Sequence, residues 1–175
     1  MKKRNYTISI YTENNVGLLN RISAIFLKRH INIRSVTSSE SEIPNIYRFI
    51  IVVKVDGEQI IKLAKQIEKQ IEVIAAFYHT DEETIYLETA LYKVNSKSLF
   101  EERQIQNIIK KSRANIVTVK PEYFVIEKTG WREETEDLYH KLKKYGLLQF
   151  VRSGRISVSK SSMEISKHLK NNENE

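Results

Sequence analysis

The sequence contains no cysteine and only two prolines and five glycines among its 175 residues. The absence of cysteine excludes a disulfide framework and any metal site built on thiolates, and it is compatible with a reducing compartment. No segment approaches the roughly 18 consecutive apolar residues of a membrane-spanning helix. The basic N-terminus is not followed by the apolar run of a signal peptide. We therefore expect a cytoplasmic protein.

Positive charge is in excess, with a formal net charge of +7 and a pI of about 9.4, which raises the question of nucleic-acid binding. Basic and acidic residues are nevertheless interspersed along both halves, so a solvated surface is the preferred interpretation. An RNA- or DNA-binding module would need aromatic residues on an exposed sheet face. Tyr47, Phe49 and Tyr92 are the candidates, and Phe49 fits a core better.

The common catalytic motifs are also missing. The four histidines lie far apart and form no HExxH pair, and there is no glycine-rich phosphate loop and no GxSxG motif. Glu133 and Glu134 are adjacent, but they fall in the first turn of an expected helix, where the helix dipole favours acidic residues. We therefore predict no catalytic residue, no metal site and no cofactor in this chain, which favours a binding or regulatory protein.

Hydrophobic periodicity predicts the same order of elements twice: strand, helix, strand, strand, helix, strand. In the first half, strands are expected at residues 6–11, 31–36, 46–55 and 73–78, with helices at 17–30 and 60–71. In the second half, strands are expected at residues 84–94, 114–119, 123–127 and 147–158, with helices at 99–112 and 131–145. Gly146 is expected to end the last helix, and Ser153-Gly154 can interrupt the last strand.

Two such βαββαβ units predict an α+β protein of two ferredoxin-like sandwiches, each with an antiparallel four-stranded sheet and two helices on one face. The expected domains are residues 1–80 and 81–160, followed by a flexible polar tail at 161–175. No proline- or glycine-rich linker separates the halves, so we expect them to pack together or to follow each other closely. The uncovered face of each small sheet favours an oligomer.

One of the few glycines, Gly17, stands between two asparagines and the first turn of a helix. The first amides of a helix have no partner within it and lie at the positive end of its dipole, so a carboxylate fits there. Gly17 removes a Cβ that would keep a ligand away from the backbone, and Asn14 or Asn15 could accept a hydrogen bond from an ammonium group. The loop would thus bind both the carboxylate and the ammonium group of an α-amino acid.

A plainer interpretation stays open, in which Asn15 caps the helix and Gly17 relieves a tight turn. Asn32, at the start of the second strand, is expected near the same corner, because that strand should neighbour the first. Asn32 could also come from a second copy of the chain.

These residues carry a resemblance to a known family. Residues 13–21 and 29–37 resemble the N-terminal ACT domain of the small regulatory subunit of acetolactate synthase (acetohydroxyacid synthase). That family has an acid-Asn-x-x-Gly-x-Leu-x-Arg segment before the helix and an Asn-Ile-x-Ser-Leu/Val-Thr segment after it. The resemblance extends more weakly over the rest of the chain, including residues 68–70 and 151–154. The chain differs at Asn20, where a small residue is common, at Arg34, where an acidic residue is frequent, and after Gly154, where the family is usually apolar.

The resemblance implies a non-catalytic regulatory subunit in the biosynthesis of valine, leucine and isoleucine. Such a subunit binds the large catalytic subunit, which carries thiamine diphosphate, Mg²⁺ and FAD, and raises its activity. It also confers feedback inhibition by a branched-chain amino acid, usually valine, bound between the ACT domains of a homodimer. The alternative is a free-standing ACT-type amino-acid sensor that acts on another enzyme or on transcription.

The resemblance also implies the effector site. Its residues in this chain are Asn14, Asn15, Val16, Gly17, Leu18, Asn32 and Ile33. Asn14, Gly17 and the neighbouring backbone would hold the effector, with Asn32 and Ile33 on the strand that pairs with the other copy. The apolar effector side chain would meet Val16, Leu18 or Ile33.

Overall fold

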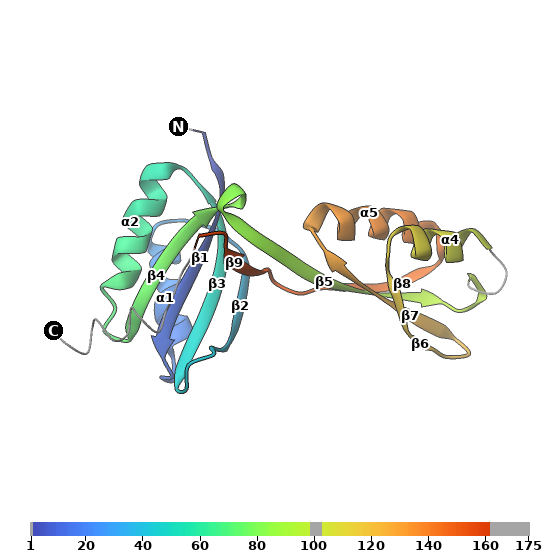
Figure 1. Ribbon diagram of the computed structural model, residues 1–175, viewed down its shortest axis with the longest axis horizontal. Helices are drawn as coiled ribbons and strands as arrows, with labels where there is room; N and C mark the ends of the chain where they lie inside the picture. The colour runs from blue at the N-terminus through green and yellow to red at the C-terminus, as the bar shows by residue number, and fades with distance from the viewer. Residues whose placement is uncertain (1, 99–102, 162–175) are drawn as a thin grey trace. The chain divides into compact units, whose positions relative to one another are not determined.

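The computed structural model describes residues 2–98 and 103–161 of the chain (Figure 1). Residues 99–102, where one helix was expected to begin, and residues 162–175, nearly all of the expected tail, lie outside the described residues. The chain forms two compact units: residues up to Tyr86 together with the segment from Arg155 onward, and residues Leu87–Gly154. The domains expected from the sequence divided at residue 80 instead, and placed residues 155–160 with the second half.

The first unit is a βαββαβ sandwich. Its elements are β1 (Arg4–Glu13), α1 (Leu18–Lys28), β2 (Ile33–Glu40), β3 (Ile46–Val55), α2 (Gly57–Glu68) and β4 (Val73–Thr80). The strands form an antiparallel sheet in the order β2-β3-β1-β4. Both helices lie on one face of this sheet (Figure 1). The predicted strand at residues 46–55 has the bounds of β3. Strands β1 and β4 are longer than predicted, and β2 begins two residues later and ends four residues later than predicted.

The second unit has the same plan. Its elements are β5 (Thr84–Asn95), α4 (Arg103–Lys111), β6 (Asn115–Val119), β7 (Tyr123–Gly130), α5 (Arg132–Leu142) and β8 (Leu147–Arg152). The sheet order is β6-β7-β5-β8. A short last strand, β9 (Ile156–Ser159), also pairs with β5, but it belongs to the first unit, as do residues 84–86 at the start of β5. Gly146 has φ 75°, which confirms it as the residue that ends the α5 segment. The predicted interruption at Ser153-Gly154 is also confirmed, since it separates β8 from β9.

Each core lies between its sheet and its helices, because the apolar residues recur every two residues on the strands and every three or four on the helices. In the first unit, β1 contributes Ile8 and Ile10, and these pack against the apolar stripes of α1 and α2. The buried residues of α1 are Leu18, Ile22, Ile25 and Phe26. In the second unit, Ile105, Ile109, Leu138 and Leu142 are the buried apolar helix residues. The predicted α+β ferredoxin-like architecture is therefore confirmed.

Two apolar residues at the ends of the predicted helices 60–71 and 131–145 do not pack on a core. Ile71 is 97% exposed, because α2 ends at Glu68 and residue 71 lies in the following turn. Trp131 is also exposed, because it precedes α5 as its N-cap residue. Both errors come from extending a periodic pattern beyond the end of a helix. In the described ranges, no helix is both long and apolar enough to cross a membrane.

Candidate functional site

The loop between β1 and α1 is organised around Gly17. This residue has φ 83° and ψ 1°, a left-handed conformation that glycine adopts without strain. A Cβ at this position would meet no atom within 4 Å, so the space above the backbone is open. Gly17 is also the N-cap of α1, and no side chain caps the helix. The interpretation of Asn15 as the cap is therefore wrong, and the Asn15 amide nitrogen donates to Glu13 Oε2 at 3.1 Å.

The amides at the start of α1 are available to a ligand. The Gly17 carbonyl accepts the first helical hydrogen bonds, from Asn20 N at 3.1 Å and Arg21 N at 3.3 Å. Within the described part of the chain, the amides of Gly17, Leu18 and Leu19 have no acceptor. Unpaired amides at the positive end of a helix dipole attract an anion. The loop can therefore hold a carboxylate against its backbone.

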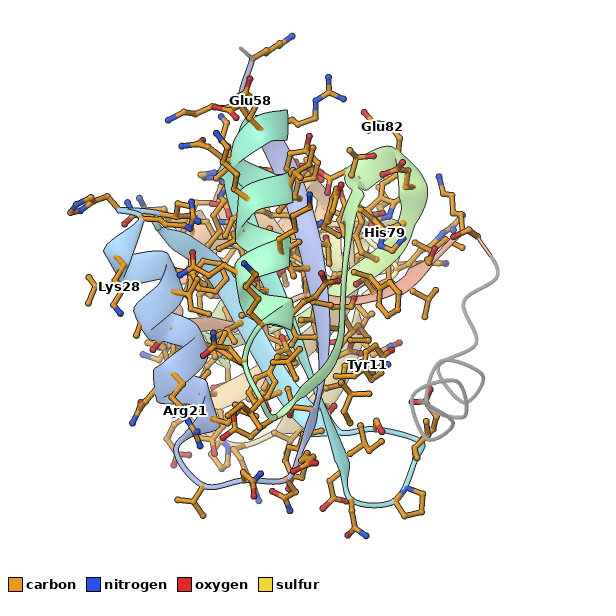
Figure 2. The ribbon with its side chains drawn as sticks, turned by 90° about the vertical axis from the view of Figure 1, so that its left-hand side faces the viewer. Tyr11, Arg21, Lys28, Glu58, His79 and Glu82 are labelled. Carbon is orange, nitrogen blue, oxygen red and sulfur yellow. The ribbon has the colours of Figure 1, made fainter. Side chains whose placement is uncertain are left out.

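The first turn of α1 is fixed to the start of β4. Arg21 pairs with Glu72 through Nη1 and Oε1, and the Glu72 carbonyl accepts a hydrogen bond from the Glu13 amide at 3.0 Å. In Figure 2, Arg21 lies at the loop end of α1 and Lys28 lies at the other end. The sequence marked Arg21 only as part of a motif, because its partner lies 51 residues away. The ion pair positions the helix whose amides face the candidate site.

The side chains of the loop divide into two groups. The side chains of Asn14, Asn15 and Val16 are exposed, and Val16 is fully exposed to solvent. Leu18 is only 3% exposed and packs in the core between the sheet and the helices. Its side chain therefore cannot meet a ligand in the loop, and only its backbone amide can contribute.

Asn32 and Ile33 do not lie near this loop in the same chain. We expected β2 to neighbour β1, and this was wrong, because β3 lies between them. Ile33 pairs with Val53, which pairs with Tyr6 near the start of β1, whereas the loop follows the end of β1. Asn32 therefore stands at the opposite end of the sheet, where it lines a cavity of about 590 Å³.

The β2 side of this unit is an exposed edge. Among the described residues, strand β2 pairs with β3 alone, so its other row of backbone groups is available within that part of the chain. Exposed apolar side chains accompany it: Leu19 and Leu27 on α1, and Val36 on β2 itself. Leu27 is 75% exposed. Sheet edges with apolar neighbours are surfaces on which a second chain can pair.

Two of the three aromatic residues considered for nucleic-acid binding lie in the cores, and the third, Tyr47, is partly buried and packs against the core of the first unit. Phe49 and Tyr92 are buried, and the Tyr92 hydroxyl donates to the Thr135 carbonyl at 2.7 Å. Burial raises the pKa of Tyr92 well above its ordinary range. In the described ranges, no group of three or more His, Asp or Glu side chains is placed to hold a metal ion.

Comparison with known proteins adds a second line of evidence. Residues 6–72 match the family model of the ACT domain, and residues 87–161 match the model described as the small subunit of acetolactate synthase. The acetolactate synthase small subunit of Bacillus subtilis is 34% identical over 158 residues, covering 90% of this chain and 91% of that one. The probable small subunit of Methanothermobacter thermautotrophicus is 30% identical, covering 93% and 96%. The crystal structure of the Thermotoga maritima small subunit superposes with a TM-score of 0.82 at 28% identity, covering 91% of this chain and 99% of that chain.

Proposed function

This chain belongs to the family of acetolactate synthase small subunits, and from that premise we propose that it activates a catalytic acetolactate synthase subunit and makes it sensitive to valine. The family membership rests on relatives that match almost the whole chain. The observation that carries the valine site is the row of unpaired amides at Gly17, Leu18 and Leu19 beside two exposed asparagines.

The loop offers complementary groups for an amino-acid zwitterion. The amides of the first turn bind the carboxylate, and the side-chain oxygen of Asn14 or Asn15 accepts from the ammonium group. Asn15 uses its nitrogen on Glu13, which leaves its oxygen available. Val16 is exposed beside these groups and supplies an apolar contact for a branched side chain.

A second copy of the chain completes this site in the proposal. When two β2 edges pair antiparallel about a twofold axis, the start of one β2 lies beside the end of the other. The end of β2 is at the loop end of the sheet, because β1 and β2 run parallel on either side of β3. Asn32 and Ile33 of one copy thus approach the Asn14–Gly17 loop of the other. The exposed Leu19, Leu27 and Val36 are buried by the same pairing.

The regulation follows from linkage. Valine that contacts both copies favours the arrangement that brings the two half-sites together, and that arrangement couples differently to the catalytic subunit. Thiamine diphosphate, Mg²⁺ and FAD belong to the catalytic subunit, and this chain contributes no catalytic group. The complex acts in the cytoplasm, in branched-chain amino acid biosynthesis.

Two substitutions at Gly17 test the site. Asn and Asp both tolerate the left-handed backbone and have nearly the same shape. Gly17→Asp adds a charge about 4 Å from the effector carboxylate, a repulsion of roughly 1 kcal/mol in water and roughly 4 kcal/mol at an effective dielectric of 20. Calorimetric titration with valine should therefore give weaker binding for Gly17→Asp than for Gly17→Asn. Leucine and isoleucine serve as related ligands, and lysine as an unrelated one.

The outcomes separate the possible assignments. Equal valine affinity for Gly17→Asp and the unmodified chain would contradict the site. Valine binding without any effect on acetolactate formation by the catalytic subunit would favour a free-standing sensor instead.

A further inference from the structure

A second cavity lies on the face of the first unit's sheet that the helices do not cover. It measures about 160 Å³ and is lined largely by polar side chains. These include Ser9 and Tyr11 of β1, Arg48 of β3, His79 of β4, and Ser157 and Ser159 of β9. In Figure 2, Tyr11 and His79 both lie on the side of the sheet away from α1 and α2. We call this space the Arg48 cavity.

Arg48 is the unusual residue of this cavity. It stands opposite Tyr11 across the β1–β3 ladder, and its Nε atom is buried without a hydrogen-bond partner. Glu42 also lines the cavity, but the ion pairs formed among the described residues do not include Arg48. A buried donor without an acceptor is costly, and more so when it is charged. An acceptor from outside the chain would remove this cost.

The groups around Arg48 are mostly neutral hydrogen-bond donors. Burial raises the pKa of the Tyr11 phenol, so its hydroxyl keeps its proton at neutral pH. The Tyr11 ring is held edge-to-face by Phe77, with centroids 6.4 Å apart. Ser159 Oγ lies 3.4 Å from His79 Nε2 and 2.6 Å from Ser161 Oγ. One guanidinium surrounded by hydroxyl groups is suited to an oxyanion.

The wall contributed by β9 is firmly held. Arg155 donates to Thr7 Oγ1 at 2.8 Å and to Asp81 Oδ1 at 2.6 Å, and its guanidinium lies 3.6 Å from the centre of the Tyr86 ring. The Lys160 amide donates to the Glu83 carbonyl at 2.9 Å. These contacts fix β9 across the outer face of the sheet, so the Arg48 cavity is a built feature of the unit.

We propose that the Arg48 cavity binds a small oxyanion, with Arg48 supplying the positive charge and the hydroxyls of Tyr11 and Ser159 supplying further hydrogen bonds. At about 160 Å³, the space suits a carboxylate or phosphate group rather than a large metabolite. The cavity lies on the opposite face of the sheet from α1, so it is distinct from the Asn14–Gly17 loop. The proposal does not depend on the proposed function.

The buried Nε–H of Arg48 gives a direct measurement. Its ¹H–¹⁵N NMR signal, assigned by its loss in Arg48→Gln, should shift downfield and saturate when the full chain is titrated with the bound oxyanion at constant ionic strength. Inorganic phosphate, sulfate and acetate are the probes. Saturation with acetate alone identifies a carboxylate site, and saturation with phosphate or sulfate identifies a site for tetrahedral oxyanions. Shifts that do not saturate with any probe would overturn the proposal.

Thermal unfolding provides the matched comparison. The saturating oxyanion should raise the melting temperature of the unmodified chain and of Arg4→Gln, a control at an exposed arginine. The oxyanion should raise the melting temperature of Arg48→Gln little or not at all. It should raise the melting temperature of Ser159→Ala by an intermediate amount. Gly17→Asp should keep the full oxyanion response, so a failed effector site and a failed Arg48 cavity give different results. An equal increase in Arg48→Gln would contradict the assignment.

Discussion

Replacing Arg152 should destabilise the second unit strongly. Arg152 Nη1 lies 3.1 Å from Glu88 Oε1, and its Nη2 pairs with Glu136. The side chains of Arg152 and Glu88 are only 14% and 9% exposed, and Glu88 also accepts a hydrogen bond from Thr135 Oγ1 at 2.8 Å. Breaking a buried pair from one side typically costs 3–5 kcal/mol, because the remaining charge is left without its partner. Since Thr135 remains, we expect Arg152→Met to lower the free energy of unfolding by about 3 kcal/mol.

Urea unfolding followed by Trp131 fluorescence measures this effect. Trp131 is the only tryptophan, and it lies in the second unit, so its signal reports on that unit. The matched control is Glu136→Gln. It removes a partner whose side chain is 41% exposed and should cost less than about 1 kcal/mol. A double variant, Arg152→Met with Glu88→Gln, removes the stranded charge and should recover part of the loss.

Two results would refute this reasoning. One is an Arg152→Met variant that is no less stable than Glu136→Gln. This would mean that the buried Arg152–Glu88 pair adds nothing to the stability that the more exposed Arg152–Glu136 pair provides. The other is a double variant that loses the sum of its two single substitutions, which would show that Arg152 and Glu88 are not coupled.

Gly146→Ala should lower the stability of the second unit by about 1–2 kcal/mol, because alanine is strained at φ 75° and its Cβ would lie 3.3 Å from Asn95 Cβ. Urea unfolding followed by Trp131 fluorescence measures this loss, and an unchanged midpoint would contradict it. A hydrogen bond from Arg152 lowers the pKa of Glu136. The ionised Glu136 side chain should therefore stabilise the fold fully above its pKa in the unfolded chain, about 4.3, and this stabilisation should disappear as the pH falls through its lower pKa in the folded chain. In acid, the free energies of unfolding of Glu136→Gln and of the unmodified chain should converge. The proposed pairing of two β2 edges predicts that Leu27→Glu shifts the chain toward monomer in sedimentation equilibrium, whereas Ile61→Glu on α2 does not. Equal dimer content in both variants would contradict this pairing.

Local pattern predicted the elements well, because each strand and helix has one face turned to a core. The apolar run at residues 46–55 coincides with β3, and Gly146 ends its helix as expected. Chain order did not predict sheet order. Asn32 was placed beside the loop on the assumption that consecutive parallel strands are neighbours, whereas β3 separates them.

The candidate site was predictable only in part. Gly17 was identified because a glycine at a strand-to-helix turn leaves the backbone open to a ligand, and the space around it is open. Its left-handed conformation agrees with the tight turn that was considered as the alternative. Leu18 was placed against the effector, but it is the first core residue of α1. Arg48 and Arg155 gave no signal, because their surroundings come from strands far apart in the sequence. Such sites depend on pairing between strands that are far apart in the sequence, and hydrophobic periodicity does not predict that pairing.

The most direct test of the shared effector site is a mixing experiment between two defective chains. Gly17→Asp and Asn32→Asp each remove one half of every site in their own homodimer. When the two chains are co-expressed and assembled at random, the heterodimer contains one site with both defects and one intact site. We predict that each variant alone binds valine more weakly than the unmodified chain does, and that the mixture contains about a quarter of the unmodified number of sites with unmodified affinity, measured by calorimetry. A mixture without any site of unmodified affinity, or a single variant that keeps the unmodified affinity, would contradict a site formed by the loop of one copy and the β2 edge of the other.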